Sequence, residues 1–155
     1  MANPSKRKGT AAETAAVKAA RRLGFPLADR HPLKGAKDEG DIWLCPGLIV
    51  EVKARKTRPS AGQIEDWLDE TLAETHNAHA DFGFLLFRQP GIPESRAECW
   101  PAYFKWNWLM RQTSSLIADL PLAHEWATVS MEYGALLKIL RRMGWGTEIW
   151  GEPLS

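Results

Sequence analysis

The stretch GDIWLCPGLIVEVKARK, residues 40–56, decides how this chain is expected to fold. Two short runs of mostly apolar residues flank a Pro-Gly pair, which is typical of two strands joined by a tight turn. Charged side chains interrupt these runs at Asp41, Glu51 and Lys53. Because burial of an unpaired charge is costly, their presence inside predicted strands needs a physical reason.

The second run predicts a strand with two different faces. Side chains alternate along a strand, so Glu51 and Lys53 share one face with Ile49. The opposite face is entirely apolar and consists of Leu48, Val50, Val52 and Ala54. At roughly 3.3 Å per residue, Glu51 and Lys53 lie about 6.6 Å apart along the strand, so both side chains point at one small site.

Whether Asp41 joins this site depends on the turn. A three-residue loop over residues 45–47 puts Asp41 opposite Glu51, on the same face of the strand pair. A two-residue loop over residues 46–47 puts it opposite Val52, on the other face. Pro-Gly suits a type II turn, so the turn chemistry leaves both registers open.

The order of the other predicted elements is that of an α/β protein. Residues 10–24 have the apolar stripe of a helix that ends near Gly24, and a second helix begins after Ser60. Strands are expected over residues 25–31, 82–87, 99–106 and 125–131, and helices over 108–120 and 133–144. Pro101 would restrict its strand to an edge or a bulge.

Composition predicts one folded domain. The chain has 155 residues, of which 45% are hydrophobic, and it contains eight tryptophans. We expect a flexible basic arm over residues 1–9, a core over 10–106 and a C-terminal α/β extension over 107–155. No apolar run approaches the roughly 20 residues of a membrane span, so we expect a soluble, cytoplasmic protein.

The net charge of +1 conceals a strong asymmetry. Residues 1–58 carry 13 Lys and Arg against 6 Asp and Glu, a balance of +7, whereas the remainder carries −6. A cationic N-terminal half predicts a polyanionic partner such as nucleic acid. A solvated surface with chance clustering of charges is the alternative.

Two converging carboxylates beside a lysine suggest a metal site. Mg²⁺ prefers oxygen ligands and is commonly held by one or two carboxylates, water and phosphate oxygens. Such a cation activates water and neutralises phosphodiester charge, while Lys53 would orient the water or stabilise the transition state. The simpler interpretation is that Glu51 and Lys53 form an ion pair on a solvent-facing strand.

An Asp followed by Glu-x-Lys on the next strand resembles the signature of the PD-(D/E)XK nuclease superfamily. Asp41, nine intervening residues, and then Glu51 and Lys53 match it, although Gly40 replaces the usual proline before the aspartate. This resemblance implies a restriction-endonuclease-like core, with a central mixed sheet flanked by helices in the order αβββαβ.

Within that superfamily, residues 9–88 resemble Holliday junction resolvases of the archaeal and phage type. Gly9, Thr10 and Glu13 match the start of their first helix, and Arg30 and Gly35 match a strand arginine and a loop glycine. This resemblance implies Mg²⁺-dependent (or Mn²⁺-dependent) paired cleavage of four-way DNA junctions by a homodimer.

The candidate site residues follow from both lines of reasoning. Asp41, Glu51 and Glu13 are the expected metal ligands, and Lys53 and Gln63 complete the catalytic set. Glu13 and Gln63 each lie three residues after a Thr or Ser, so capping boxes would also explain them. The expected phosphate contacts are Lys6, Arg7, Lys8, Arg30, Lys34, Lys37, Arg55, Lys56 and Arg58.

Two other functions fit the same residues. A restriction or repair nuclease that cuts duplex or single-stranded DNA would share the core motif. A catalytically silent DNA-binding module would retain the fold without cleavage.

Overall fold

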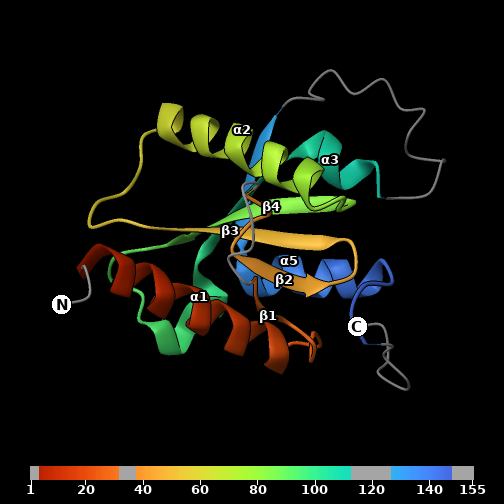
Figure 1. The fold of residues 1–155 in the computed structure, drawn as a ribbon, viewed down its shortest axis with the longest axis horizontal. Helices are drawn as coiled ribbons and strands as arrows, with labels where there is room; N and C mark the ends of the chain where they lie inside the picture. Colours follow the sequence, from red (N-terminus) through yellow and green to blue (C-terminus); the bar gives the residue numbers. More distant parts are fainter. Residues whose placement is uncertain (1–3, 32–37, 113–126, 148–155) are drawn as a thin grey trace.

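The fold is described from a computed structural model, which covers residues 4–31, 38–112 and 127–147, with only the backbone for residues 4–8 (Figure 1). Within these ranges, six strands form one mixed, open sheet in the order β1-β2-β3-β4-β5-β6. The strands are β1 (Asp29–Arg30), β2 (Ile42–Cys45), β3 (Leu48–Ala54), β4 (Phe82–Arg88), β5 (Pro101–Lys105) and β6 (Thr128–Glu132). Strands β3 and β4 are parallel, and all other neighbours are antiparallel.

Four α-helices and one 3-10 helix are described. They are α1 (Pro4–Arg22), α2 (Ala61–Asn77), η1 (Glu94–Cys99), α3 (Trp106–Met110) and α5 (Tyr133–Arg142). The predicted α/β class and the order αβββαβ for the first six elements are therefore present. No described helix combines the length and the apolar character needed to cross a membrane.

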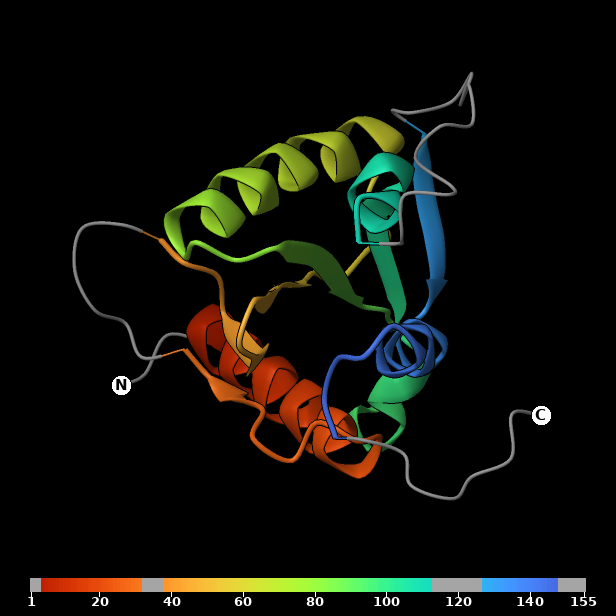
Figure 2. The same ribbon diagram turned by 90° about the vertical axis from the view of Figure 1, so that its right-hand side faces the viewer.

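The helices form a layer on each face of the sheet. Helices α1, η1 and α5 cover one face, and α2 and α3 cover the other (Figure 2). The layer on the α1 side holds the larger hydrophobic core, to which the apolar face of β3 contributes Leu48, Val50 and Val52. The α2 side holds a smaller cluster of Trp67, Leu68, Leu85 and Phe87. Glu51 and Lys53, on the opposite face of β3, therefore point toward the α2 layer.

Helix α1 begins earlier than the sequence predicted. It starts at Pro4, where proline is compatible with the first turn of a helix. Lys6, Arg7 and Lys8 therefore lie in the helical backbone, and the prediction of a flexible arm over residues 1–9 is wrong from Pro4 onward. The first three residues lie outside the described ranges.

The C-terminal third extends the main sheet. Strand β6 pairs along the whole of β5, and α5 packs beside α1, where the Tyr133 hydroxyl donates a buried hydrogen bond to the Ala16 carbonyl at 3.2 Å. Strand β5 is thus interior, whereas Pro101 had predicted a strand at an edge or with a bulge. Pro101 is tolerated because it is the first residue of the strand.

Two other predicted elements differ from the prediction within the described residues. The strand over residues 25–31 is reduced to Asp29–Arg30, because residues 23–28 form turns after α1. The helix predicted over residues 108–120 is described only to the end of α3 at Met110. Residues 113–126 lie outside the described ranges, as do Lys34, Gly35 and Lys37.

A close approach between α2 and β4 fixes the height of α2 above the sheet. A Cβ atom at Gly83 would lie 2.0 Å from Thr75 Oγ1 and 3.1 Å from Ile49 Cγ1. Glycine at this position lets the helix descend until Thr75 contacts the strand backbone. The same descent brings the neighbouring residue Glu74 into the interior, where it is 5% exposed.

We expect Gly83→Ala to lower the free energy of unfolding by about 1–3 kcal/mol, because the added methyl group pushes α2 away from the sheet. Urea unfolding followed by tryptophan fluorescence measures the change. Gly62→Ala is the matched control, since its Cβ would lie 3.9 Å from Ser60 Oγ and meet no clash. A Gly83→Ala protein as stable as the wild type would contradict this account of the packing.

Candidate active site

A β-bulge sets the register between β2 and β3. Cys45 pairs with Leu48, so the turn between the strands contains only two residues. Beyond the turn Trp43 pairs with Ile49, which leaves Leu44 as an extra residue in β2. The strand pair therefore has a two-residue turn, and the bulge shifts its register by one residue just after it.

The bulge brings Asp41 to Glu51. After the shift Ile42 pairs with Val50, the Asp41 N–H donates to the Val50 carbonyl at 3.1 Å, and Asp41 Oδ2 accepts from the Val52 N–H at 2.9 Å. The side chains of Asp41 and Glu51 are within hydrogen-bonding contact. The predicted meeting of the two carboxylates therefore occurs, although the two-residue turn alone predicted the opposite face.

Glu51 and Lys53 form an ion pair in which Glu51 is buried and Lys53 is partly buried. Lys53 Nζ lies 2.8 Å from Glu51 Oε1, and the two side chains are 17% and 7% exposed, respectively. The pairing agrees with the simpler interpretation of the Glu-x-Lys tripeptide, but its burial does not, because that interpretation placed the pair in solvent. The pair lies under α2, on the face of β3 opposite the main core.

Helix α2 adds two carboxylates that the sequence analysis did not single out. Glu70 Oε2 lies 2.8 Å from Lys53 Nζ, and Glu74 is in hydrogen-bonding contact with Glu51. Glu70 and Glu74 follow the buried Trp67 at three and seven residues, which is the spacing of one helical face. That spacing was a signal in the sequence that could have indicated them.

Glu13 and Arg30 stand at the margin of the site. Glu13 Oε2 accepts from Arg30 Nε at 2.6 Å, and the negative charge of Glu13 contributes to the raised pKa of Asp41. Because Thr10 lies inside α1, a capping box at Thr10 does not explain Glu13. Glu13, Asp41, Glu51, Glu70 and Glu74 are called the carboxylate cluster below.

Gln63 is placed differently. Ser60 caps α2, and its Oγ accepts from the Gln63 backbone N–H at 3.1 Å. Gln63 is exposed in the first turn of the helix, one turn before Trp67. The hydrogen bond from the Gln63 backbone to Ser60 that a capping box requires is therefore present. A catalytic role for the Gln63 side chain stays a prediction from the resemblance.

Burial and mutual repulsion perturb the carboxylates strongly. Burial, and then the charge of Glu51, raise the pKa of Asp41 to about 7 against the hydrogen bond from Val52. Burial and the charge of Glu74 raise the pKa of Glu51 to about 7, although Lys53 opposes this shift. Burial likewise raises the pKa of Glu74 to about 7. The site therefore holds more negative charge than its protein partners neutralise.

The lysine is shifted in the direction that favours its charge. Burial acts to lower the pKa of Lys53, but hydrogen bonds and charge attraction from Glu51 and Glu70 outweigh it and raise that pKa above its ordinary value. Lys53 is accordingly a permanent ammonium at neutral pH and cannot serve as a general base there.

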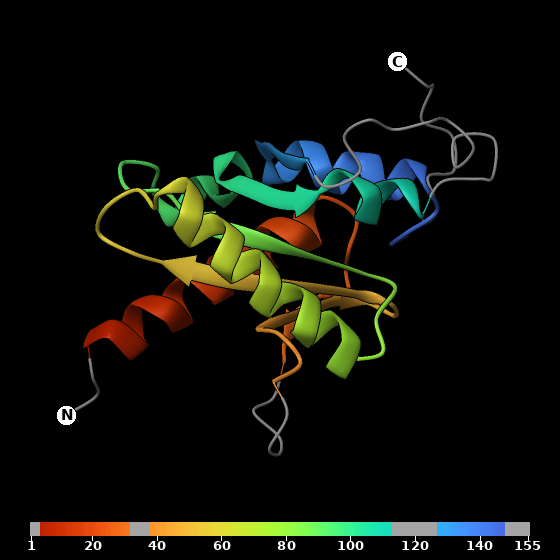
Figure 3. The ribbon, with the colours of Figure 1, turned by 90° about the horizontal axis from the view of Figure 1, so that it is seen from above.

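Three predicted phosphate-binding residues follow β3 directly. Arg55, Lys56 and Arg58 are exposed in the linker to α2, and the Arg55 guanidinium lies 5.6 Å from the centre of the Trp67 ring. This linker and the start of α1, with Lys6, Arg7 and Lys8 in its backbone, lie at the same end of the molecule (Figures 1 and 3). Lys34 and Lys37 are outside the described residues.

The donor set suits a hard divalent cation. Asp41 and Glu51 offer carboxylate oxygens in mutual contact, which a cation could hold together in place of a shared proton. Among residues 4–31, 38–112 and 127–147, however, no group of three or more His, Cys, Asp or Glu is arranged as a metal site. The candidate cation sites in the described residues are therefore pairs of carboxylates.

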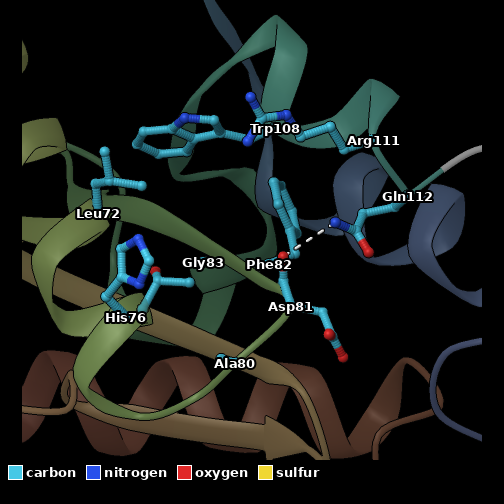
Figure 4. A pocket seen from close by; sticks show the side chains of 10 residues that line it. Leu72, His76, Ala80, Asp81, Phe82, Gly83, Trp108, Arg111 and Gln112 are labelled. Carbon is cyan, nitrogen blue, oxygen red and sulfur yellow. Dashed lines mark hydrogen bonds between the residues drawn. The ribbon is translucent and has the colours of Figure 1, made fainter. Parts of the chain in front are cut away.

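A separate hollow of about 180 Å³ opens at the C-terminal end of α2 (Figure 4). Leu72 and His76 of α2 line one side, and Trp108 and Arg111, in and just after α3, line the other. Gln112 Nε2 donates to the Asp81 carbonyl at 3.0 Å at its rim. No member of the carboxylate cluster lines this hollow, so it is distinct from the candidate active site.

Comparison of the chain with models of known protein families, with characterised proteins and with solved structures found no match. The candidate site is therefore interpreted from its own geometry and chemistry.

We expect the metal-free protein to lose stability as the pH rises from about 4 to 7.5. Unfolded carboxylates titrate near pH 4, whereas Asp41, Glu51 and Glu74 titrate near 7 in the folded state, so the folded state binds more protons across this window. The free energy of unfolding therefore falls with pH. Urea titrations in EDTA at several pH values measure the slope.

Glu74→Gln should flatten this slope, because one of the three groups no longer titrates. Asp69→Asn is the matched control, since Asp69 is an exposed residue of the same helix. Equal slopes for the wild type and Glu74→Gln would contradict the perturbed titration of the site.

Proposed function

We propose that this protein is a metal-dependent endonuclease that hydrolyses phosphodiester bonds in DNA. The observation that carries the proposal is the meeting of Asp41 and Glu51 beside the partly buried Lys53, at the point where the bulge sets the strand register. Two carboxylates and an ammonium in contact are the groups required for metal-assisted attack of water on a phosphodiester.

Asp41 and Glu51 would hold Mg²⁺ or Mn²⁺, with Glu13 near enough to act electrostatically on Asp41. When bound, the cation activates water and neutralises charge on the phosphate. The protein holds its ligands rigidly, because the Val52 N–H fixes Asp41 and Lys53 fixes Glu51. A site with fixed ligands loses little energy to reorganisation during the reaction.

Lys53 would stabilise negative charge that develops on the phosphate. Its raised pKa keeps it protonated, and Glu51 and Glu70 hold the ammonium from two sides. Glu70 is the more exposed partner, with a side chain 53% exposed. An incoming phosphate oxygen can therefore replace Glu70 at the ammonium while Glu51 keeps Lys53 in place.

The basic linker would hold the DNA backbone. The linker that follows β3 carries Arg55, Lys56 and Arg58, all within five residues of Lys53. Phosphates bound to this linker would therefore lie close to the candidate site. Contacts of this kind bind phosphate without regard to base sequence.

The narrower proposal is cleavage of four-way junctions by a Holliday junction resolvase acting as a homodimer. It rests on the resemblance of residues 9–88, and one observation supports it. Glu13 and Arg30, two residues that carry the resemblance, form an ion pair at the margin of the carboxylate cluster. Paired cuts on opposite strands require two active sites, which a dimer supplies.

Cleavage of labelled four-way junction, duplex and single-stranded DNA with Mg²⁺ tests both levels of the proposal. We expect Mg²⁺-dependent cutting with preference for the junction, and a loss of at least about 100-fold in Glu51→Gln and in Lys53→Met, because each removes a charged group at the reacting phosphate. Gel electrophoresis of end-labelled strands measures the rates.

Asp69→Asn and Lys138→Ala are matched controls, since each removes one charge from an exposed residue outside the cluster. Equal cutting of all three substrates would reject the resolvase proposal. Undiminished cutting by Glu51→Gln and Lys53→Met would reject the site, and the absence of cutting with either Mg²⁺ or Mn²⁺ would favour a silent DNA-binding module.

Binding to DNA should weaken steeply with salt, because the expected contacts are phosphate contacts. Replacing Arg55, Lys56 and Arg58 together with alanine should reduce the slope of log affinity against log salt by about 3 on duplex DNA. Fluorescence anisotropy in Ca²⁺ at several NaCl concentrations measures the slope. An unchanged slope would show that the linker does not contact the DNA backbone.

A further inference from the structure

Glu74 is a buried carboxylate that the charge of Lys53 favours without forming an ion pair with it in the described residues. It is 5% exposed, and its Oε2 atom makes no hydrogen bond in the described structure. No salt bridge joins it to a Lys, Arg or His within the ranges that the structure covers. A buried acceptor left unpaired in this way costs free energy, so its position beside Glu51 needs an explanation.

The charge balance around Glu74 points to cations. The carboxylate cluster supplies five acidic groups, and Arg30 and Lys53 form ion pairs with it. With all groups ionised, the excess is three negative charges. Asp38 also repels Glu74 and brings the excess to four, so one divalent cation leaves the site anionic and repulsive to a phosphodiester, whereas two neutralise it.

The geometry provides two pairs of carboxylates that share one member. Glu51 is in hydrogen-bonding contact with Asp41, which precedes β2, and with Glu74, on α2 above. Each pair is smaller than a three-residue metal group. Carboxylates shared between neighbouring cations are a regular feature of sites that hold two divalent metals for phosphodiester cleavage.

We propose that Glu74 and Glu51 form a second divalent-cation position, adjacent to the one between Asp41 and Glu51, with Glu51 shared by both. The proposal rests on the proposed function for the first cation. It assigns to α2, outside the Asp and Glu-x-Lys motif, a direct part in metal binding. The Gly83 close approach is what lowers Glu74 to the required depth.

Isothermal titration calorimetry of the full chain with Mn²⁺ at pH 8, without DNA, tests the proposal. We expect two Mn²⁺ ions per chain for the wild type, one for Glu74→Gln and two for the control Asp69→Asn. Electron paramagnetic resonance should show coupling between the two ions in the wild type and in Asp69→Asn, but not in Glu74→Gln.

The same number of ions in the wild type and Glu74→Gln would overturn the second position, and cleavage by Glu74→Gln at the wild-type rate would do the same. Neither result affects the proposed function, which depends on Glu51 and Lys53. Absence of any Mn²⁺ binding together with absence of cleavage would reject both proposals.

Thermal unfolding provides a readout that a merely structural role would not reproduce. In EDTA at pH 8, Glu74→Gln should have a higher Tm than the wild type, because it removes an uncompensated buried charge. Addition of Mn²⁺ should raise the Tm of Glu74→Gln less than that of the wild type. A lower Tm of the variant in both buffers would overturn the proposal.

Discussion

The register of β2 on β3 is the constraint on which the candidate site depends. Side chains of a strand change face with every residue, so a shift of one position would separate Asp41 from Glu51 by the thickness of the sheet. A two-residue turn alone would produce that separation. Leu44, the extra residue of the bulge, restores the pairing, and its own side chain is fully buried in the larger core. Hydrophobic packing of a single leucine is thereby coupled to the position of an acidic group on the opposite face.

The two layers of helices cover different kinds of side chain on the two faces of the sheet. The α1 side is an apolar core of ordinary character, in which the aromatic rings of Phe82, Phe84, Phe104 and Tyr133 contact one another. It supplies most of the apolar burial, and so it can support a costly opposite face. On the α2 side, part of the surface of β3 is given to charged groups, and α2 shields them from bulk water. The free energy gained by apolar packing on the α1 side thus offsets the cost of burying charged groups on the α2 side.

The local sequence pattern was sufficient to predict many of the helices and strands, but not the register of β2 on β3. Alternation in residues 48–54 predicted the bounds of β3, and the Ser60 cap predicted the start of α2, because each depends on neighbours in sequence. The bulge at Leu44 depends on how a side chain fits the core, which no local pattern contains. Glu74 was missed for a related reason, since its burial results from the contact of Thr75 in α2 with Gly83 in β4, which depends on how the helix packs on the sheet. The interior position of β5 results from its pairing with β6, which the residues of β5 alone do not predict.

The hydrogen bond from Tyr133 to Ala16 has a consequence for how the chain folds during synthesis. Helix α1 is made first, yet it packs against α5 and η1 as well as against the early strands. Its apolar face therefore remains incompletely covered until residues 133–140 have left the ribosome. Contacts that span more than a hundred residues favour slow, late closure of the core. The apolar face of α1 is consequently more exposed to solvent before α5 has been synthesised than it is in the folded protein.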